Sequence, residues 1–366
     1  MTGKHNRIIL GLLSDDLWTG TPKLAPGEIP DQGSLTQDIE WGAKTTSLDD
    51  FGIFLDHFQA AGYDEGDTAR TYQNGSQEAF TAAVGYKQRN LTIATKLYPD
   101  RPGMHTPENL RANVEESLKQ LKTDYVDIFY LHAPDRSVPF EKTLGAIDEL
   151  YKEGKFKQFG LSNYTAFEVA EIVMICREKG WIRPTVYQGV YNAITRSIES
   201  ELIPACRRYG LDIVTYNGLA GGLLTGKYKA GQTDAPGSLT TVDHVYRKRY
   251  IRNGYLDALN VIEPIVTAHG LTLIEVAMRW LVHHSVLKMR TEGGNDGIII
   301  GASSLAQLDN NLAVLEKGPL PKEVVDALDD GWQMAKATAP DYWHLDLEYK
   351  YDTQAELFGQ AAKGTV

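Results

Sequence analysis

Cysteine is scarce in this chain, and membrane-length apolar runs are missing. Only two cysteines, Cys176 and Cys206, occur among 366 residues, so we expect no disulfide framework and a reducing compartment. No apolar run approaches the length that crosses a membrane. The short run 8–13 ends in Ser and Asp, so it predicts a first strand instead of a signal peptide. We therefore expect a cytoplasmic protein.

Positive charge is also in deficit. The formal net charge is -11 at pH 7, which argues against a nucleic acid or an anionic membrane as the main partner. A local basic pocket for one phosphate remains compatible with this balance.

Several catalytic and binding motifs are absent as well. No Gly-x-Ser-x-Gly elbow occurs, which argues against a serine hydrolase, and no Gly-x-Gly-x-x-Gly follows an early strand, so a Rossmann domain has no support. Residues 221–227 fit the start of a P-loop, but Tyr228 stands where a Ser or Thr belongs. His283-His284 lies in a helical pattern where adjacent residues point apart. Metal-assisted hydrolysis is therefore the weaker alternative, and we expect no metal site.

What the chain does contain is an alternation of strand-like and helix-like segments. Eight strands, nearly all separated by helices, predict a single α/β domain, a (β/α)₈ TIM barrel. The barrel spans 1–345 and includes a loop insertion at 14–45. The tail 346–366 follows an aromatic stretch that begins after Pro340, and we expect it to cross one barrel end. The predicted strands are 8–13, 67–72, 91–96, 126–132, 159–163, 186–188, 211–217 and 297–301, and the predicted helices are 47–61, 75–88, 106–121, 139–153, 165–179, 199–209, 257–269, 272–286 and 305–316.

Four reactive side chains fall at the ends of successive predicted strands: Asp67, Tyr72, Lys96 and His132. Barrel enzymes build their active sites at the carboxyl ends of the strands. A tyrosine, whose pKa is ordinarily about 10, becomes a better acid beside an ammonium group, and a carboxylate holds that ammonium in place. An imidazole can orient a carbonyl oxygen. Each residue alone has an ordinary packing or surface role as its alternative, but together they predict protonation of an aldehyde or ketone oxygen while hydride reaches its carbon.

Later strand ends offer groups suited to a dinucleotide. Amide and hydroxyl groups there match a nicotinamide carboxamide, Tyr216 can stack on a flat ring, and glycines allow the backbone to approach a pyrophosphate. An ordinary flexible loop is the alternative explanation for these glycines. The residues concerned are Ser162, Asn163, Gln188, Tyr216, Gly218, Gly221, Gly222 and Lys227.

In their order and spacing, these motifs resemble the aldo-keto reductase superfamily. The motifs include Asp67 through Tyr72, Ile93-Ala-Thr-Lys96, Gly160-Leu-Ser-Asn163 and Gly301-x-Ser303-Ser304-x-x-Gln307. The segment 216–228 is similar to the aflatoxin-aldehyde reductase branch, and the resemblance covers roughly residues 46–343. It implies a barrel that binds NADPH without a Rossmann domain, and it favours a homodimer.

The resemblance also implies roles for matching residues. Tyr72 is expected to donate the proton, Lys96 and Asp67 to tune it, and His132 and Tyr246 to contact the substrate. The residues predicted to bind the cofactor are Ser162, Asn163, Gln188, Tyr216, Asn217, Leu219, Gly221, Gly222, Lys227, Arg249, Gly301, Ser303, Gln307 and Asn311.

The sequence departs from the superfamily pattern at the expected adenosine end. Gly301 and Gln307 stand where many members carry a Lys and an Arg, so Arg249, followed by Arg247, is predicted to read the 2′-phosphate of NADPH. The leading function is reduction of a carbonyl compound, either in detoxification or in biosynthesis. A non-enzymatic dinucleotide-binding regulatory subunit of the same fold is the alternative.

Overall fold

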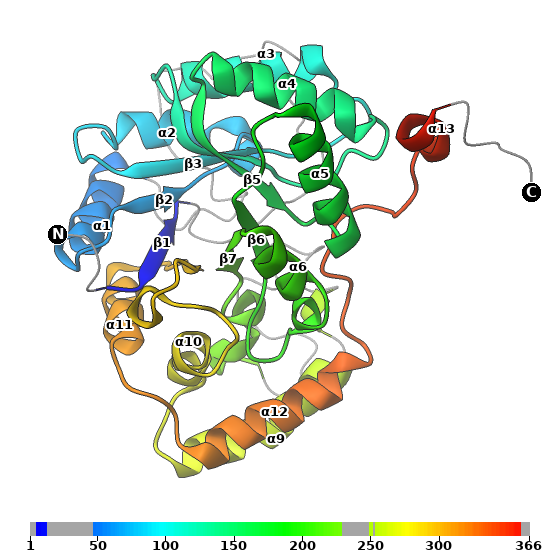
Figure 1. Cartoon of the computed structure of the whole chain (residues 1–366). Coiled ribbons are helices and arrows are strands. Elements are labelled where there is room, and N and C mark those ends of the chain that lie inside the picture. Colours follow the sequence, from blue (N-terminus) through cyan, green and yellow to red (C-terminus); the bar gives the residue numbers. More distant parts are fainter. Residues whose placement is uncertain (1–4, 13–46, 229–248, 252, 360–366) are drawn as a thin grey trace, which may run out of the picture.

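The computed structural model describes residues 5–12, 47–228, 249–251 and 253–359. The predicted insertion 14–45, Tyr246 and Arg247 lie outside these residues. Within the described part, eight parallel strands close into a barrel in chain order (Figure 1). The strands are β1 Arg7–Gly11, β2 Glu65–Asp67, β3 Thr92–Leu97, β4 Val126–Leu131, β5 Phe156–Ser162, β6 Val186–Val190, β7 Asp212–Tyr216 and β8 Gly297–Ile300.

The barrel is closed by pairing between its first and last strands, with Ile8 beside Ile298 and Leu10 beside Ile300. The strands alternate with helices that surround them, and this confirms the predicted (β/α)₈ barrel. The helices are α1 Leu48–Ala60, α2 Gln77–Ala83, α3 Pro107–Gln120, α4 Phe140–Lys152, α5 Ala166–Lys179, α6 Leu202–Tyr209, α9 Asn253–Ala268, α10 Leu273–His283, α11 Leu305–Leu315, α12 Lys322–Lys336 and α13 Thr353–Phe358. Short 3₁₀ turns are η2 Tyr72–Gly75, η3 Ser197–Glu199, η4 Ala220–Thr225 and η5 Arg290–Glu292.

Side-chain caps explain where several helices begin. The Ser47 hydroxyl accepts a hydrogen bond from the Asp50 backbone N–H at the start of α1, and Thr106 caps α3 in the same way, with Pro107 at the first helical position. Thr165 and Glu168 form a reciprocal capping box at the start of α5. These local signals confirm the predicted starts of the three helices.

One strand and two helices differ from the prediction. Strand β2 covers Glu65–Asp67 instead of 67–72. Helix α2 covers only Gln77–Ala83 instead of 75–88, because Gly75 before it and Gly85 after it have positive φ values that lie outside the helical region. Helix α12 was not predicted, although Val324, Leu328 and Trp332 recur at helical spacing and are buried. It packs along α9 (Figure 1), so the barrel wall gains an outer layer there.

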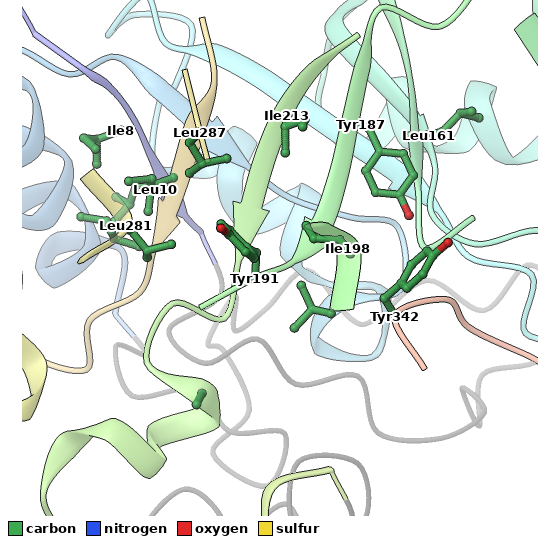
Figure 2. Close-up of a cluster of buried hydrophobic side chains, with 14 of the residues drawn as sticks. Ile8, Leu10, Leu161, Tyr187, Tyr191, Ile198, Ile213, Leu281, Leu287 and Tyr342 are labelled. Atoms are coloured by element: carbon green, nitrogen blue, oxygen red, sulfur yellow. The ribbon is translucent and has the colours of Figure 1, made fainter. Parts of the chain in front are cut away.

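The core has two layers that follow the alternation of side chains along each strand. Outward-facing residues pack against the helices. Figure 2 shows part of this layer, where Tyr342, from beyond α12, lies close to Tyr187 of β6. Inward-facing residues form a smaller cluster inside the barrel: Ile9, Ala94, Ile128, Tyr130, Val186, Val214 and Ile299.

We expect Gly160→Ala to destabilise the barrel because Gly160 leaves the space that the Tyr130 ring occupies. A Cβ at this position would lie 2.4 Å from the Tyr130 ring and 2.9 Å from a Val186 methyl group. Overpacking of this kind costs about 1–3 kcal/mol. Urea unfolding measures the loss, and Gly318→Ala serves as the control because no atom lies within 4 Å of its added Cβ. Equal stability of the two variants would contradict the close contact.

Within the described ranges, no single helix is long and apolar enough to cross a membrane. Residues Gly254–Ala268 and Leu273–His283 pass that test only as a pair, and the chain bends by 95° between them. Both helices bury apolar side chains in the core of the protein.

Candidate active site

Strand alternation places the predicted catalytic residues in one inward-facing layer. Lys96 follows Ala94, and His132 follows Tyr130, at a spacing of two residues, so each continues the interior face of its strand. Asp67 bears the same relation to Glu65, whose carboxylate binds Arg7 deeper in the barrel. The site therefore lies at the carboxyl end of the barrel, above its apolar interior.

Lys96 and Asp67 form a buried ion pair. The Lys96 Nζ donates to Asp67 Oδ2 at 2.5 Å and to the carbonyl oxygen of Thr68 at 2.8 Å. Neither side chain is more than 4% exposed, so a broken pair would leave an uncompensated charge inside the protein. The Gln188 amide donates to the second oxygen of Asp67 at 3.0 Å and fixes the carboxylate from the opposite side.

Tyr72 lies directly beside this pair. The Lys96 Nζ is 4.8 Å from the centre of the Tyr72 ring, which is cation–π distance. Tyr72 begins η2, and the next three residues all have positive φ values, 50° at Gln73, 51° at Asn74 and 86° at Gly75. Such a run is unusual for non-glycine residues and marks a backbone held by its surroundings.

Arg70 holds this loop closed. Its Nη1 donates to the carbonyl oxygen of Gly75 at 2.9 Å and lies 3.6 Å from the buried carboxylate of Glu78. The Thr95 hydroxyl, one residue before Lys96, donates to the same carboxylate at 2.6 Å. The tyrosine loop and the lysine strand are thus tied together on the outer side of the barrel.

His132 completes the cluster. Its ring contacts Tyr72 edge-on, with centroids 5.8 Å apart, and Tyr98 at 5.4 Å. Burial lowers the pKa of His132 well below its usual value, and the Lys96 charge lowers it further. Its Nδ1 is buried and has no hydrogen-bond partner among the described residues. The neutral imidazole therefore keeps a polar atom available for a ligand.

The residues predicted for the nicotinamide end come together on β5 and β7. Tyr216 donates its hydroxyl hydrogen bond to Asn163 Oδ1 at 2.8 Å, and the Asn163 amide donates to the Ser162 hydroxyl at 3.0 Å and to the His132 carbonyl. Asn163 has a φ of 61°, a left-handed conformation that asparagine adopts more readily than most residues. Gln188 meets Asp67, as described above.

The segment 217–227 is a tight succession of turns. Asn217 accepts a hydrogen bond from the backbone N–H of Gly221, and its amide donates to Tyr250. Gly221 and Gly222 have φ values of 61° and 92°. Glycine adopts such left-handed conformations at little cost, so the backbone conformation favours glycine at both positions. Leu219 precedes η4, and Lys227 is exposed at the end of the segment.

The residues predicted for the adenosine end meet at the start of α11. The Gln307 side-chain oxygen accepts from both the backbone and the hydroxyl of Ser303, and Ser304 caps the helix. The buried Asn311 donates to the carbonyl of Gly301. Arg249 instead donates from its Nη2 to the carbonyl oxygen of Asp341 at 3.2 Å.

These residues fit a dinucleotide that carries a nicotinamide ring. The His132 ring lies against Tyr72, and its Nδ1 lacks a hydrogen-bond partner within the described ranges. Ser162 and Asn163 supply hydroxyl and amide groups, and the Asn163 amide bonds the His132 carbonyl. The turns of η4 follow β7. The part of the chain that the structure describes contains no group of three or more His, Cys, Asp or Glu side chains that could hold a metal ion.

Sequence reasoning missed three contributors to the site. The Thr68 carbonyl binds Lys96, Tyr98 packs against His132, and His344 of the tail lies against Tyr98. Tyr98 could have been found, because it follows Lys96 by two residues at the same strand end. The position of His344 depends on how the tail folds back onto the barrel, and no local sequence pattern predicts that path.

Fold and cluster together define a barrel protein with an acid–base group at the carboxyl end of its strands. The sequence model of the Aldo/keto reductase family matches residues 36–333 of this chain. The chain is similar to aldo-keto reductase pigE of Monascus ruber, with 40% identity over 319 residues, which cover 83% of this chain and 92% of that protein.

The chain is also similar to proteins that are named as aldehyde reductases. Aflatoxin B1 aldehyde reductase member 2 of Mus musculus is 42% identical over 299 residues, which cover 78% of this chain and 81% of that protein. Aflatoxin B1 aldehyde reductase member 4 of Homo sapiens is 41% identical over 299 residues, covering 78% and 89%. The chain belongs to the aldo/keto reductase family and is an oxidoreductase by that membership. The predicted resemblance to the aflatoxin-aldehyde reductase branch is confirmed.

Proposed function

We propose that the protein is an NADPH-dependent reductase that converts an aldehyde or ketone into an alcohol, with Tyr72 as the proton donor. The observation that carries this proposal is the buried cluster in which Lys96 binds Asp67 and lies over the Tyr72 ring. Family membership and the names of the aldehyde-reducing relatives support it.

The chain's own residues bind the carbonyl oxygen and deliver its proton. Bound NADPH supplies the hydride for the carbonyl carbon. The Lys96 ammonium makes Tyr72 a stronger acid, since a nearby positive charge favours the ionised phenol. The neutral imidazole of His132 can hydrogen-bond the carbonyl oxygen without competing for the role of acid. Ser162, Asn163 and Gln188 are proposed to hold the nicotinamide.

Turnover of 4-nitrobenzaldehyde with NADPH tests this function. The purified protein should consume NADPH in proportion to the alcohol formed. A regulatory subunit of the same fold would instead bind NADPH without consuming it. If the protein is saturated with NADPH and reduces neither this aldehyde nor a panel of small aldehydes and dicarbonyls, the proposal is rejected.

We expect the protein to prefer NADPH over NADH, with Arg249 as the main contributor. Arg249 follows two basic residues, Arg247 and Lys248, in the sequence, and its Nη1 is buried without a hydrogen-bond partner among the described residues. Loss of one arginine that binds the 2′-phosphate should weaken NADPH binding by about 1.5–3 kcal/mol, the scale of hydrogen bonds to charged groups. NADH binding should hardly change in Arg249→Ala. Fluorescence titration with both dinucleotides measures this.

Arg290→Ala is the control for this titration. Arg290 belongs to η5, on the loop that leads into β8, and so lies at the opposite end of the barrel from the site. Equal weakening of NADPH and NADH by Arg249→Ala would show that Arg249 does not read the 2′-phosphate. Equal affinities of the wild-type protein for the two dinucleotides would reject the preference itself.

A further inference from the structure

The chain beyond α12 returns to the carboxyl end of the barrel, outside the range that the family model matches. The backbone N–H of His344 donates to the carbonyl oxygen of Asn163 at 3.1 Å. The Tyr342 hydroxyl donates to Glu201 and accepts from the backbone N–H of Ala166 at the start of α5. We call residues 341–350 the tail strap.

Arg136, on the loop between β4 and α4, is the anchor of this strap. It is 4% exposed, and its Nη1 donates to three successive strap carbonyls, those of residues 344, 345 and 346, at 2.9–3.2 Å. Its Nε and Nη2 bind both carboxylate oxygens of Glu168. The strap closes this network on its other side, because the Tyr349 hydroxyl donates to Glu168 at 2.8 Å and the Lys350 N–H to the Arg136 carbonyl.

The anchored strap places the His344 ring next to the catalytic cluster. Its centroid lies 6.0 Å from that of Tyr98, and Tyr98 lies 5.4 Å from His132. His344 is half-buried, and its Nδ1 lies 3.5 Å from the Tyr98 hydroxyl. Burial and the charge of Arg249 lower the pKa of His344 to about 3, so the ring is uncharged at neutral pH.

We propose that His344 is a specificity-determining residue whose uncharged ring contacts the substituent of the carbonyl substrate, and that Arg136 is the positioning residue that fixes it there. The geometry favours flat, uncharged substituents, since Tyr72, Tyr98, His132 and His344 form a continuous series of ring contacts. This inference rests on the proposed carbonyl reduction and adds the substrate class of the same site.

The test compares 4-nitrobenzaldehyde with propionaldehyde. In His344→Ala, the ratio of kcat/KM for the aromatic over the aliphatic aldehyde should fall about three- to tenfold, the size of one aromatic contact. His344→Phe keeps a ring at this position and should retain the ratio within about twofold by the same reasoning. NADPH affinity should stay unchanged in both variants. An unchanged ratio in His344→Ala, or a lost ratio in His344→Phe, overturns the ring contact.

Arg136→Lys tests the positioning role. A lysine keeps a positive charge beside Glu168 but cannot bind a carboxylate bidentately and three carbonyls at once. The ratio of kcat/KM for the aromatic over the aliphatic aldehyde should fall, as it does in His344→Ala. Combining Arg136→Lys with His344→Ala should change the ratio little beyond the effect of His344→Ala alone. The matched control is Arg111→Lys, because Arg111 also binds both oxygens of a carboxylate, that of Glu153, on the outer face of α3. Equal effects of Arg136→Lys and Arg111→Lys on the ratio would overturn the role of Arg136.

A binding measurement separates this inference from the proposed function. Binding of 4-nitrobenzyl alcohol to the protein saturated with NADP⁺, measured by calorimetry, does not depend on turnover. It should weaken in His344→Ala and not in His344→Phe. If neither aldehyde is turned over but this pattern holds, the proposed function fails and the His344 contact stands. If turnover is normal and the alcohol binds equally to all three proteins, the His344 contact fails alone.

Discussion

Tyr72→Phe should lower kcat for 4-nitrobenzaldehyde by at least about a hundredfold, the low end of the contribution of general acid catalysis. The variant removes only the phenolic hydroxyl and keeps the ring, so the contacts with Lys96 and His132 remain. NADPH affinity should therefore stay close to that of the wild-type protein. Steady-state kinetics and a fluorescence titration measure the two quantities separately.

Tyr63→Phe is the control for loss of a tyrosine hydroxyl. The Tyr63 hydroxyl donates to Glu316 and lies in the outer layer of the barrel, so its removal should leave kcat unchanged. If Tyr72→Phe retains more than half of the wild-type kcat, Tyr72 is not the proton donor.

Lys96→Met should abolish carbonyl reduction, a loss of at least about a hundredfold on the general acid scale. Methionine cannot supply the charge that makes the phenol a stronger acid. Within the described part of the chain, Lys96 is the cation that pairs with Asp67. The variant also leaves a buried carboxylate unpaired, which typically costs about 3–5 kcal/mol of stability. Circular dichroism and thermal unfolding must therefore accompany the kinetics.

Two further variants make this result decisive. The double variant Asp67→Asn, Lys96→Met removes both charges and should recover stability without recovering activity. Lys157→Met is the matched surface control, because Lys157 also binds a carboxylate, that of Asp127, and lies 4.4 Å from the Tyr125 ring. A pH–rate profile of a folded Lys96→Met protein that overlays that of the wild type would remove both Lys96 and Asp67 from the mechanism.

The sequence predicted the barrel because its strand signals and helix caps are local. The apolar run 126–131 and the Thr106-Pro107 pair both act within a few residues, and both lie where they were predicted. Helix α12 was missed even though its apolar spacing is visible, because its buried face is completed only by α9, far away in the sequence. Local patterns therefore identify elements more readily than their partners.

The catalytic layer was predictable for a related reason. A period of two along each strand fixes which residues face inward, so Asp67, Lys96 and His132 must share the interior once the barrel closes. The strap was not predictable in the same way. Its position depends on one guanidinium, that of Arg136, which reaches three backbone carbonyls about 208 residues further along the chain. The spacing of residues along the sequence does not predict a contact between a loop arginine and distant main-chain oxygens.

Pairing of β1 with β8 has a consequence for how the protein is made. Arg7 and Gly297 are neighbours in the closed sheet, so the ribosome must synthesise most of the chain before the first strand can gain its second partner. Until then, one edge of β1 and one edge of β7 stay open, and such edges invite pairing with other chains. Contacts between distant segments also slow folding. The nascent barrel is therefore most exposed to aggregation just before residues 297–300 emerge, and the strap that carries His344 emerges later still.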